Sequence, residues 1–136
     1  NIASTIINNT PINPRYYSKM SELLKELINM KKDQNLDYQD YIKHLVELVK
    51  KVKTPELSGE YPPSIHNIRL RGLYDIMDKN ETETLKLYNV LIDSTPIDFM
   101  DSKMRQRELK VTISLVISDK TKIDEVFNLW KNTRGY

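Results

Sequence analysis

The chain has 136 residues, 39% hydrophobic and 29% charged, which suits a single globular domain with a buried core. Its 21 basic and 19 acidic residues leave a net charge of +2, so the bulk charge does not indicate a strongly basic nucleic-acid binder. The lack of cysteine excludes disulfides, thiolate zinc sites and cysteine nucleophiles, and it favours a cytoplasmic location. The 3 glycines are too few for a glycine-rich phosphate loop.

Residues 1–12 resemble the tail of an upstream element followed by a connector, because polar residues interrupt the helical spacing of the first isoleucines. The chain starts at Asn1 rather than Met, so we expect it to be part of a longer protein. One helical domain is expected over residues 13–136. Its first long helix begins near Asn13, with Pro14 in the first turn, where a missing N–H is tolerated.

A second long helix is expected after Asp37, which is placed to cap it. It carries a broad apolar stripe: Tyr38, Tyr41, Ile42, Leu45, Val46, Leu48, Val49 and Val52. The short connection to the first helix predicts an antiparallel pair. The lysines at its end, Lys50, Lys51 and Lys53, suit the helix dipole better than they indicate a DNA-contacting patch.

Residues 54–63 form a proline-containing loop between this pair and a group of shorter helices. Ser64 is expected to cap the third helix, and Asn80 the fourth, with Glu83 in the arrangement of a capping box. The fourth helix is expected to bury Leu85, Tyr88, Leu91 and Ile92. The stretch from 60 to 77 thus joins the front pair to the back group.

A second loop, residues 95–102, contains three large apolar residues whose default partner is the domain's own core, with a contact to the parent chain as the alternative. A fifth helix is expected over 103–117, with its buried side formed by Met104, Leu109, Ile113, Val116 and Ile117. The sixth follows strict helical spacing at Ile123, Val126, Phe127 and Trp130. No segment alternates as a strand does, so the expected fold is all-α, an irregular bundle of about six helices.

Residues that could carry catalysis are scarce. His44 and His66 have no metal-ligand spacing around them, and we expect the first on the surface of the second helix and the second in the first turn of the third. Asp98 and Asp101 are explained by local capping. Serine elbows and Walker sequences are missing, so no catalytic, cofactor-binding or metal-binding residue is assigned.

An interaction surface is the better hypothesis for the remaining charged and apolar residues. Two arginine pairs and the apolar loop between them stand out. The candidate surface comprises Arg69, Arg71, Phe99, Met100, Arg105 and Arg107, although a solvated face explains the arginines at least as well.

Four stretches, taken in order, carry a family resemblance: NPRYYSKMSELLKELI, LDYQDYIKHLVELVKKVK, EYPPSIHNIRLRGLYDIM and VFNLWKNTRGY. Together they resemble the C-terminal helical region of the restriction (R) subunit of type I restriction-modification enzymes. The third stretch is similar to the central Tyr-Pro, Ile and Arg-x-Leu-Tyr signature of that region. Where the family's loop before the fifth helix usually has Trp followed by Arg-Gly, this chain has Phe99, Met100 and Asp101.

The resemblance implies a parent chain with a nuclease domain and two ATP-driven motor domains, which would use ATP and Mg²⁺ and lie before this segment. It implies that the helical region docks the R subunit on the methyltransferase and specificity subunits without being catalytic itself. The alternative is a helical module that contacts DNA near the motor. An independent enzyme has little support.

Overall fold

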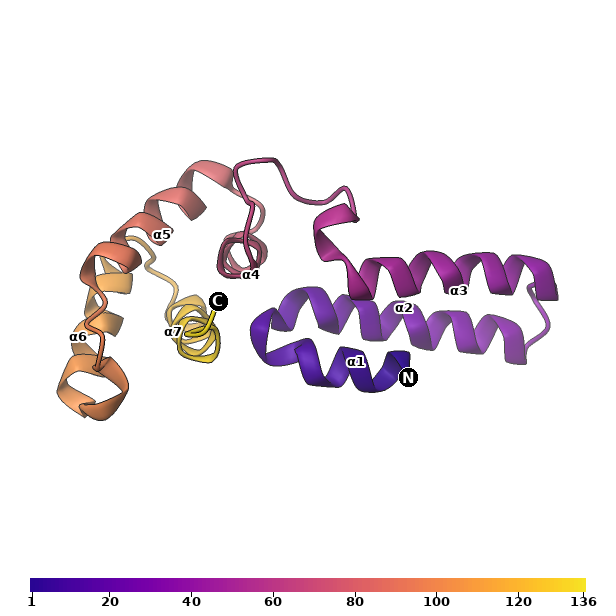
Figure 1. Cartoon of the computed structure of the whole chain (residues 1–136), viewed down its shortest axis with the longest axis horizontal. Helices are drawn as coiled ribbons and strands as arrows, with labels where there is room; N and C mark the ends of the chain where they lie inside the picture. The colour runs from indigo at the N-terminus through magenta and orange to yellow at the C-terminus, as the bar shows by residue number, and fades with distance from the viewer. The chain divides into compact units, whose positions relative to one another are not determined.

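The computed structural model describes residues 1–136, and every regular element in it is a helix. Seven α-helices and three short 3-10 helices are present, and there are no strands, so the all-α fold class is confirmed with one α-helix more than the approximate number expected. The chain forms two compact units, residues 1–61 and 62–136. The division falls inside the loop expected at 54–63, and the expected domain from residue 13 onward spans both units. Figure 1 shows the order of the helices along the chain.

The first unit is built from three helices that all contact one another. They are α1 (Ile2–Asn9), α2 (Pro14–Lys32) and α3 (Tyr38–Lys53), with the 3-10 helices η1 (Thr10–Ile12) and η2 (Pro55–Leu57) between and after them. The Asn13 side chain accepts from the N–H of Tyr16, and Pro14 takes the first helical position. Asp37 accepts from the N–H of Asp40 at the start of α3. Both starts were predicted from the sequence and are confirmed.

The core of the first unit lies where the start of α2 meets the end of α3. Tyr16 and Tyr17 are buried there, and their hydroxyls donate to Lys51 O at 2.6 Å and Val52 O at 3.3 Å. These bonds satisfy carbonyls at the end of α3, which have no partner within the helix. Helix α1 contributes Ile6, so residues 2–9 form a helix that packs within this unit.

Only part of the stripe expected on α3 is buried. Leu48 and Val52 are in the core, whereas Tyr38, Ile42 and Val46 are exposed to solvent. The physical reason is the short reach of α1: its 8 residues lie against an α2 of 19 residues, so a large part of the pair has no third helix on it.

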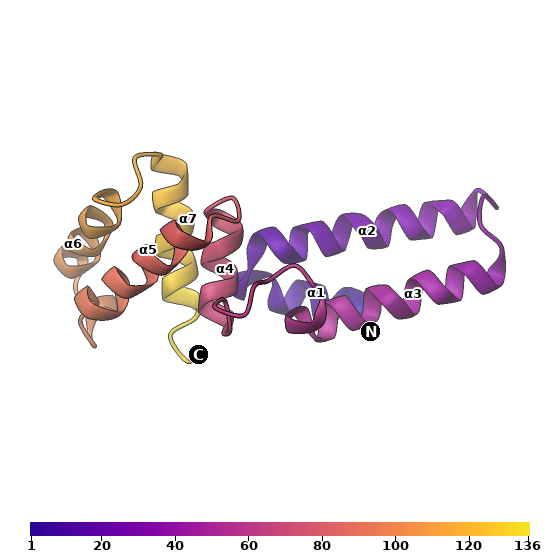
Figure 2. The same ribbon diagram turned by 90° about the horizontal axis from the view of Figure 1, so that it is seen from above.

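The second unit contains four helices in a closed ring of contacts, each packing on the next and the last on the first (Figure 2). They are α4 (Ile68–Ile76), α5 (Glu81–Ser94), α6 (Lys103–Ser114) and α7 (Lys120–Asn132), with the 3-10 helix η3 (Phe99–Asp101) before α6. Their shared core consists of Leu73, Ile76, Leu87, Leu91, Phe99, Leu109, Ile113, Ile117, Val126, Phe127, Leu129 and Trp130. The cap expected at Asn80 is confirmed, since its side chain accepts from the N–H of Glu83.

Three expectations for the second unit are wrong in detail. Helix α4 is capped by Asn67 rather than Ser64, whose hydroxyl instead bonds to Glu81, and His66 is exposed ahead of the helix. On α5, Leu91 is buried as expected, but the other buried leucine is Leu87, and the expected Leu85 is only half-buried. The register of that stripe is set by α4 and α6, which pack on α5 from two directions.

Three further residues leave the expected pattern. Ile92 on α5 and Met104 on α6 are exposed, because each lies outside the side of its helix that faces the ring. Helix α6 ends at Ser114, three residues before the expected end at Ile117, which is nevertheless buried. None of the helices combines the length and apolar character needed to cross a membrane.

Candidate interaction surface of the second unit

The loop after α5 folds back onto the core of its own unit. Phe99 is only 3% exposed and packs edge-to-face on Phe127, with ring centroids 6.4 Å apart. Met100 is partly buried against the same core. This is the default that the sequence favoured for the apolar residues of the loop. Phe99 therefore contributes to the core rather than to an exposed surface.

Arg69 extends from α4 to the C-terminal end of α7. Its Nη2 donates to Trp130 O at 3.0 Å, and its Nε donates to Thr133 O at 2.9 Å and Thr133 Oγ1 at 3.0 Å. The guanidinium also stacks on the Trp130 ring, 3.6 Å from the ring centroid. The last carbonyls of a helix have no partner within it, and the helix dipole makes that end negative. Arg69 therefore acts as a cationic cap for α7.

The surroundings of Arg69 tie three helices together. Trp130 donates from Nε1 to Thr95 Oγ1 at 3.0 Å, which links α7 to the residue that ends α5. Desolvation lowers the pKa of Arg69 below its ordinary value, and the coulombic effect of Tyr88 opposes that change. Arg69 remains charged at neutral pH, because an arginine begins so far above it.

A groove of about 220 Å³ lies beside this contact, and we call it the loop groove. Its lining residues come from α4, α5, the following loop and the end of α7: Arg69, Leu91, Ile92, Thr95, Pro96, Ile97, Phe99, Trp130 and Arg134. A hollow of about 480 Å³ shares Arg134 with it and is also lined by Met100, Lys131, Asn132 and Gly135. Ile92 is half-exposed and Ile97 fully exposed. The groove is thus lined by exposed apolar residues and by two arginines, Arg69 and Arg134.

The structure brings only part of the predicted surface together. Arg69 and Phe99 line the loop groove and Met100 lines the adjoining hollow. The other three predicted residues line neither hollow. Arg105 forms an ion pair with Asp98. Arg71 is half-buried on α4, and Arg107 is exposed on α6.

Sequence reasoning missed three residues of the groove. Ile92 was assigned to a buried stripe, Ile97 was assigned to the core with the rest of its loop, and Arg134 was not considered. The one usable signal was the position of Ile97 directly after Pro96, since a residue next to a proline turn in a loop is commonly on the surface.

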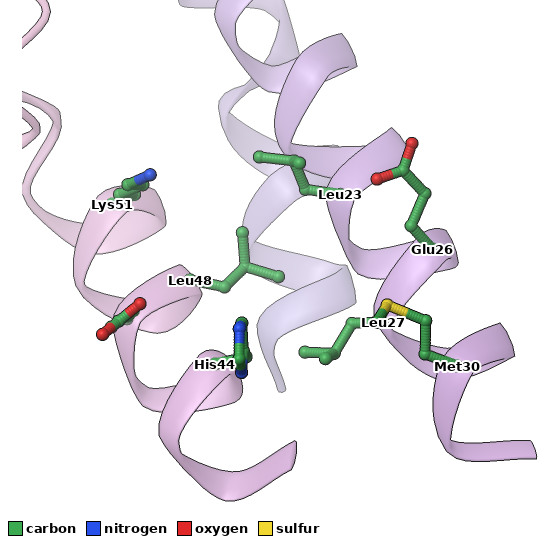
Figure 3. Close-up of a pocket in the computed structure, with 8 residues that line it drawn as sticks. Leu23, Glu26, Leu27, Met30, His44, Leu48 and Lys51 are labelled. Carbon is green, nitrogen blue, oxygen red and sulfur yellow. The ribbon is translucent and has the colours of Figure 1, made fainter. Parts of the chain in front are cut away.

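The first unit has a groove of its own, about 170 Å³, between α2 and α3. Figure 3 shows Leu23, Leu27 and Leu48 pointing into it, and Glu26 and Lys51 are also among its lining residues. His44 lies at its edge, and its Nδ1 is 2.7 Å from Asp40 O, one turn back on the same helix. The predicted surface position of His44 is confirmed.

No group of three or more His, Asp or Glu side chains in the chain is arranged to hold a metal ion. No protein-family model, curated protein or solved structure matches this chain.

Proposed function

We propose that this chain is a non-catalytic helical assembly domain of a type I restriction enzyme R subunit. In that role it docks the motor-bearing subunit on the methyltransferase and specificity subunits. Support from the sequence is the order of the four stretches that resemble the C-terminal region of R subunits. The proposal implies a cytoplasmic protein, with ATP and Mg²⁺ used by the motor and nuclease domains of the parent chain rather than by this segment.

The observation that carries the docking proposal is the set of exposed residues that line the loop groove. Ile92 and Ile97 are exposed and line the groove together with Arg134, and Lys131 lines the adjoining hollow. Protein interfaces combine an apolar centre with a polar rim and are enriched in arginine. Arg134 uses one donor locally, from Nε to Lys131 O at 3.1 Å, and its other nitrogens remain available to a partner carboxylate.

The test is assembly of the R subunit, carrying changes in this segment, with its cognate methyltransferase–specificity core. Ile97→Asp and Arg134→Glu should each weaken assembly about tenfold or more, because a buried carboxylate would replace an apolar contact or an attractive charge. Leu115→Asp is the matched control, since Leu115 is also a highly exposed apolar residue of this unit outside both hollows.

Two outcomes would overturn the proposal. One is unchanged assembly of both variants. The other is full assembly of an R subunit that lacks residues 62–136. If the segment instead contacts DNA near the motor, its binding to duplex DNA would fall steeply with salt, because displaced counterions drive such binding. Assembly with the protein core would then not depend on Ile97.

A further inference from the structure

The α2–α3 pair leaves a set of apolar side chains without a partner. Tyr38, Ile42 and Val46 follow one another at intervals of four residues on α3, and Ile28 lies on α2. Ile28, Ile42 and Val46 are 48%, 38% and 47% exposed. Residues four apart lie on one side of a helix, so the three on α3 form a continuous row.

This row lies on the side of the pair away from the groove in Figure 3. Ile42 and Val46 are each two residues from His44, which places them about 200° around α3 from the groove's edge. Helix α1 packs on the same far side, where the pale blue ribbon runs behind the pair in Figure 3. Because α1 has only 8 residues, about 12 Å of helix, it ends before it can cover the row.

The charged residues three and four positions from Ile28, Ile42 and Val46 on the same helices are all lysines. The neighbours of Ile28 at three and four residues are Leu24, Lys25, Lys31 and Lys32, and those of Val46 are Ile42, Lys43, Val49 and Lys50. The corresponding neighbours of Ile42 are Tyr38, Gln39, Leu45 and Val46. No acidic residue is among them, and none of these lysines forms an ion pair within the chain.

The opposite side of the same pair has a different charge pattern. The groove there has Glu26 and Glu47 as well as His44 and Lys51 around its apolar floor. A partner selected by charge would therefore distinguish the two sides, although the chain as a whole has a net charge of only +2.

We propose that the lysine-bordered face, formed by Ile28, Tyr38, Ile42 and Val46 with Lys25, Lys31, Lys32, Lys43 and Lys50, binds an acidic amphipathic helix of a partner protein. A helix can match the four-residue spacing of the row with its own apolar stripe, which is a common mode of recognition. Asp and Glu along both edges of that stripe would face the lysines, and this complementarity gives register and specificity. The face shares no residue with the loop groove and does not depend on the restriction-enzyme assignment.

The experiment measures binding of a fluorescently labelled synthetic peptide to the full chain by anisotropy. The peptide is an amphipathic helix of about 15 residues, with leucines on one side and glutamates at both edges of that stripe. A second peptide has lysines in place of the glutamates. The chain should bind the acidic peptide at least tenfold more tightly than the basic one, and added salt should reduce the difference.

Variants locate the site. Ile42→Ser with Val46→Ser should weaken binding of the acidic peptide at least tenfold, and Lys43→Glu with Lys50→Glu should reverse the preference between the peptides. Met104→Ser with Val111→Ser is the control, because these are exposed apolar residues on α6 in the second unit. All the substituted residues are exposed or nearly so, and circular dichroism verifies that helix content is unchanged.

Any of four results would overturn the proposal. Equal binding of the two peptides would exclude charge recognition, and unchanged binding by the Ile42 and Val46 variant would place the site elsewhere. Binding to anionic lipid vesicles without binding to the peptide would assign the face to a membrane surface. Dimerisation in sedimentation that the Val46 change abolishes would assign it to a second copy of the chain.

Discussion

Replacing Arg69 by alanine tests whether this arginine holds the second unit together or serves a binding surface. In the structure it makes three hydrogen bonds to the end of α7 and stacks on Trp130. The three hydrogen bonds share one partly exposed guanidinium and are therefore not additive; together they contribute about 2 kcal/mol, and the partly buried cation–π contact about 1 kcal/mol. Desolvation of the guanidinium offsets about 1 kcal/mol of this sum. We therefore expect Arg69→Ala to lower the free energy of unfolding by about 2 kcal/mol.

Two further variants separate geometry from charge. Arg69→Lys keeps the charge but loses the planar fork and most of the stacking, so it should restore only about half of the lost stability. Arg71→Ala is the matched control, because Arg71 lies on the same helix and is half-buried without lining the groove. A change away from caps and cores usually costs less than about 0.5 kcal/mol.

Urea unfolding followed by the fluorescence of Trp130 is the appropriate assay. Trp130 is the only tryptophan of the chain, it is buried in the second unit, and it contacts Arg69 directly. The midpoint should move while the dependence on denaturant stays constant. If Arg69→Ala destabilises no more than Arg71→Ala, or if Arg69→Lys is as stable as the original chain, the capping argument is wrong.

Two other predictions concern the ends of helices in the first unit. The hydrogen bond from the backbone N–H of Asp40 lowers the pKa of Asp37 below its ordinary 3.8. The cap therefore stabilises the fold above that pH, and this contribution is lost as the pH falls through the folded-state pKa. Asp37→Asn should flatten this acid dependence of the stability, as followed by circular dichroism. Gln34 follows α2 with a φ of 57°, a backbone conformation that favours glycine. Gln34→Gly should therefore raise the stability by about 0.5 to 1 kcal/mol in thermal unfolding. Gln39→Gly, inside α3, should lower it by a similar amount. A stabilising Gln39→Gly, or an acid profile that Asp37→Asn leaves unchanged, would contradict these two arguments.

The starts of helices could be predicted from the sequence where the capping interaction is local. Asn13, Asp37 and Asn80 each accept from an N–H three residues ahead, so the cap and its partner lie within one window of sequence. The cap of α4 was mispredicted because both Ser64 and Asn67 have a suitable side chain. Asn67 is also held from outside that window, since its Nδ2 donates to Tyr88 Oη at 3.3 Å.

Burial and the interaction surface could be predicted less well, because both depend on which elements meet in space. Arg69 and Arg71 form an unremarkable pair in the sequence. The partner that distinguishes them is Trp130, 61 residues beyond Arg69. In the same way, the periodicity of α3 correctly indicates an amphipathic helix, but not that its partner α1 is too short to cover Ile42 and Val46.

The position of the apolar residues on the lysine-bordered face bears on the kind of partner it suits. A duplex backbone offers phosphates to the lysines, but its charged exterior would leave Ile42 and Val46 in contact with water or phosphate. A protein helix can engage both kinds of residue at once, because its apolar stripe covers the row while its acidic edges meet the lysines. Salt would weaken either complex, so salt dependence alone does not separate them. The decisive variant is the uncharged one: Ile42→Ser with Val46→Ser removes the apolar contact, keeps every lysine, and should reduce binding only where the partner is apolar.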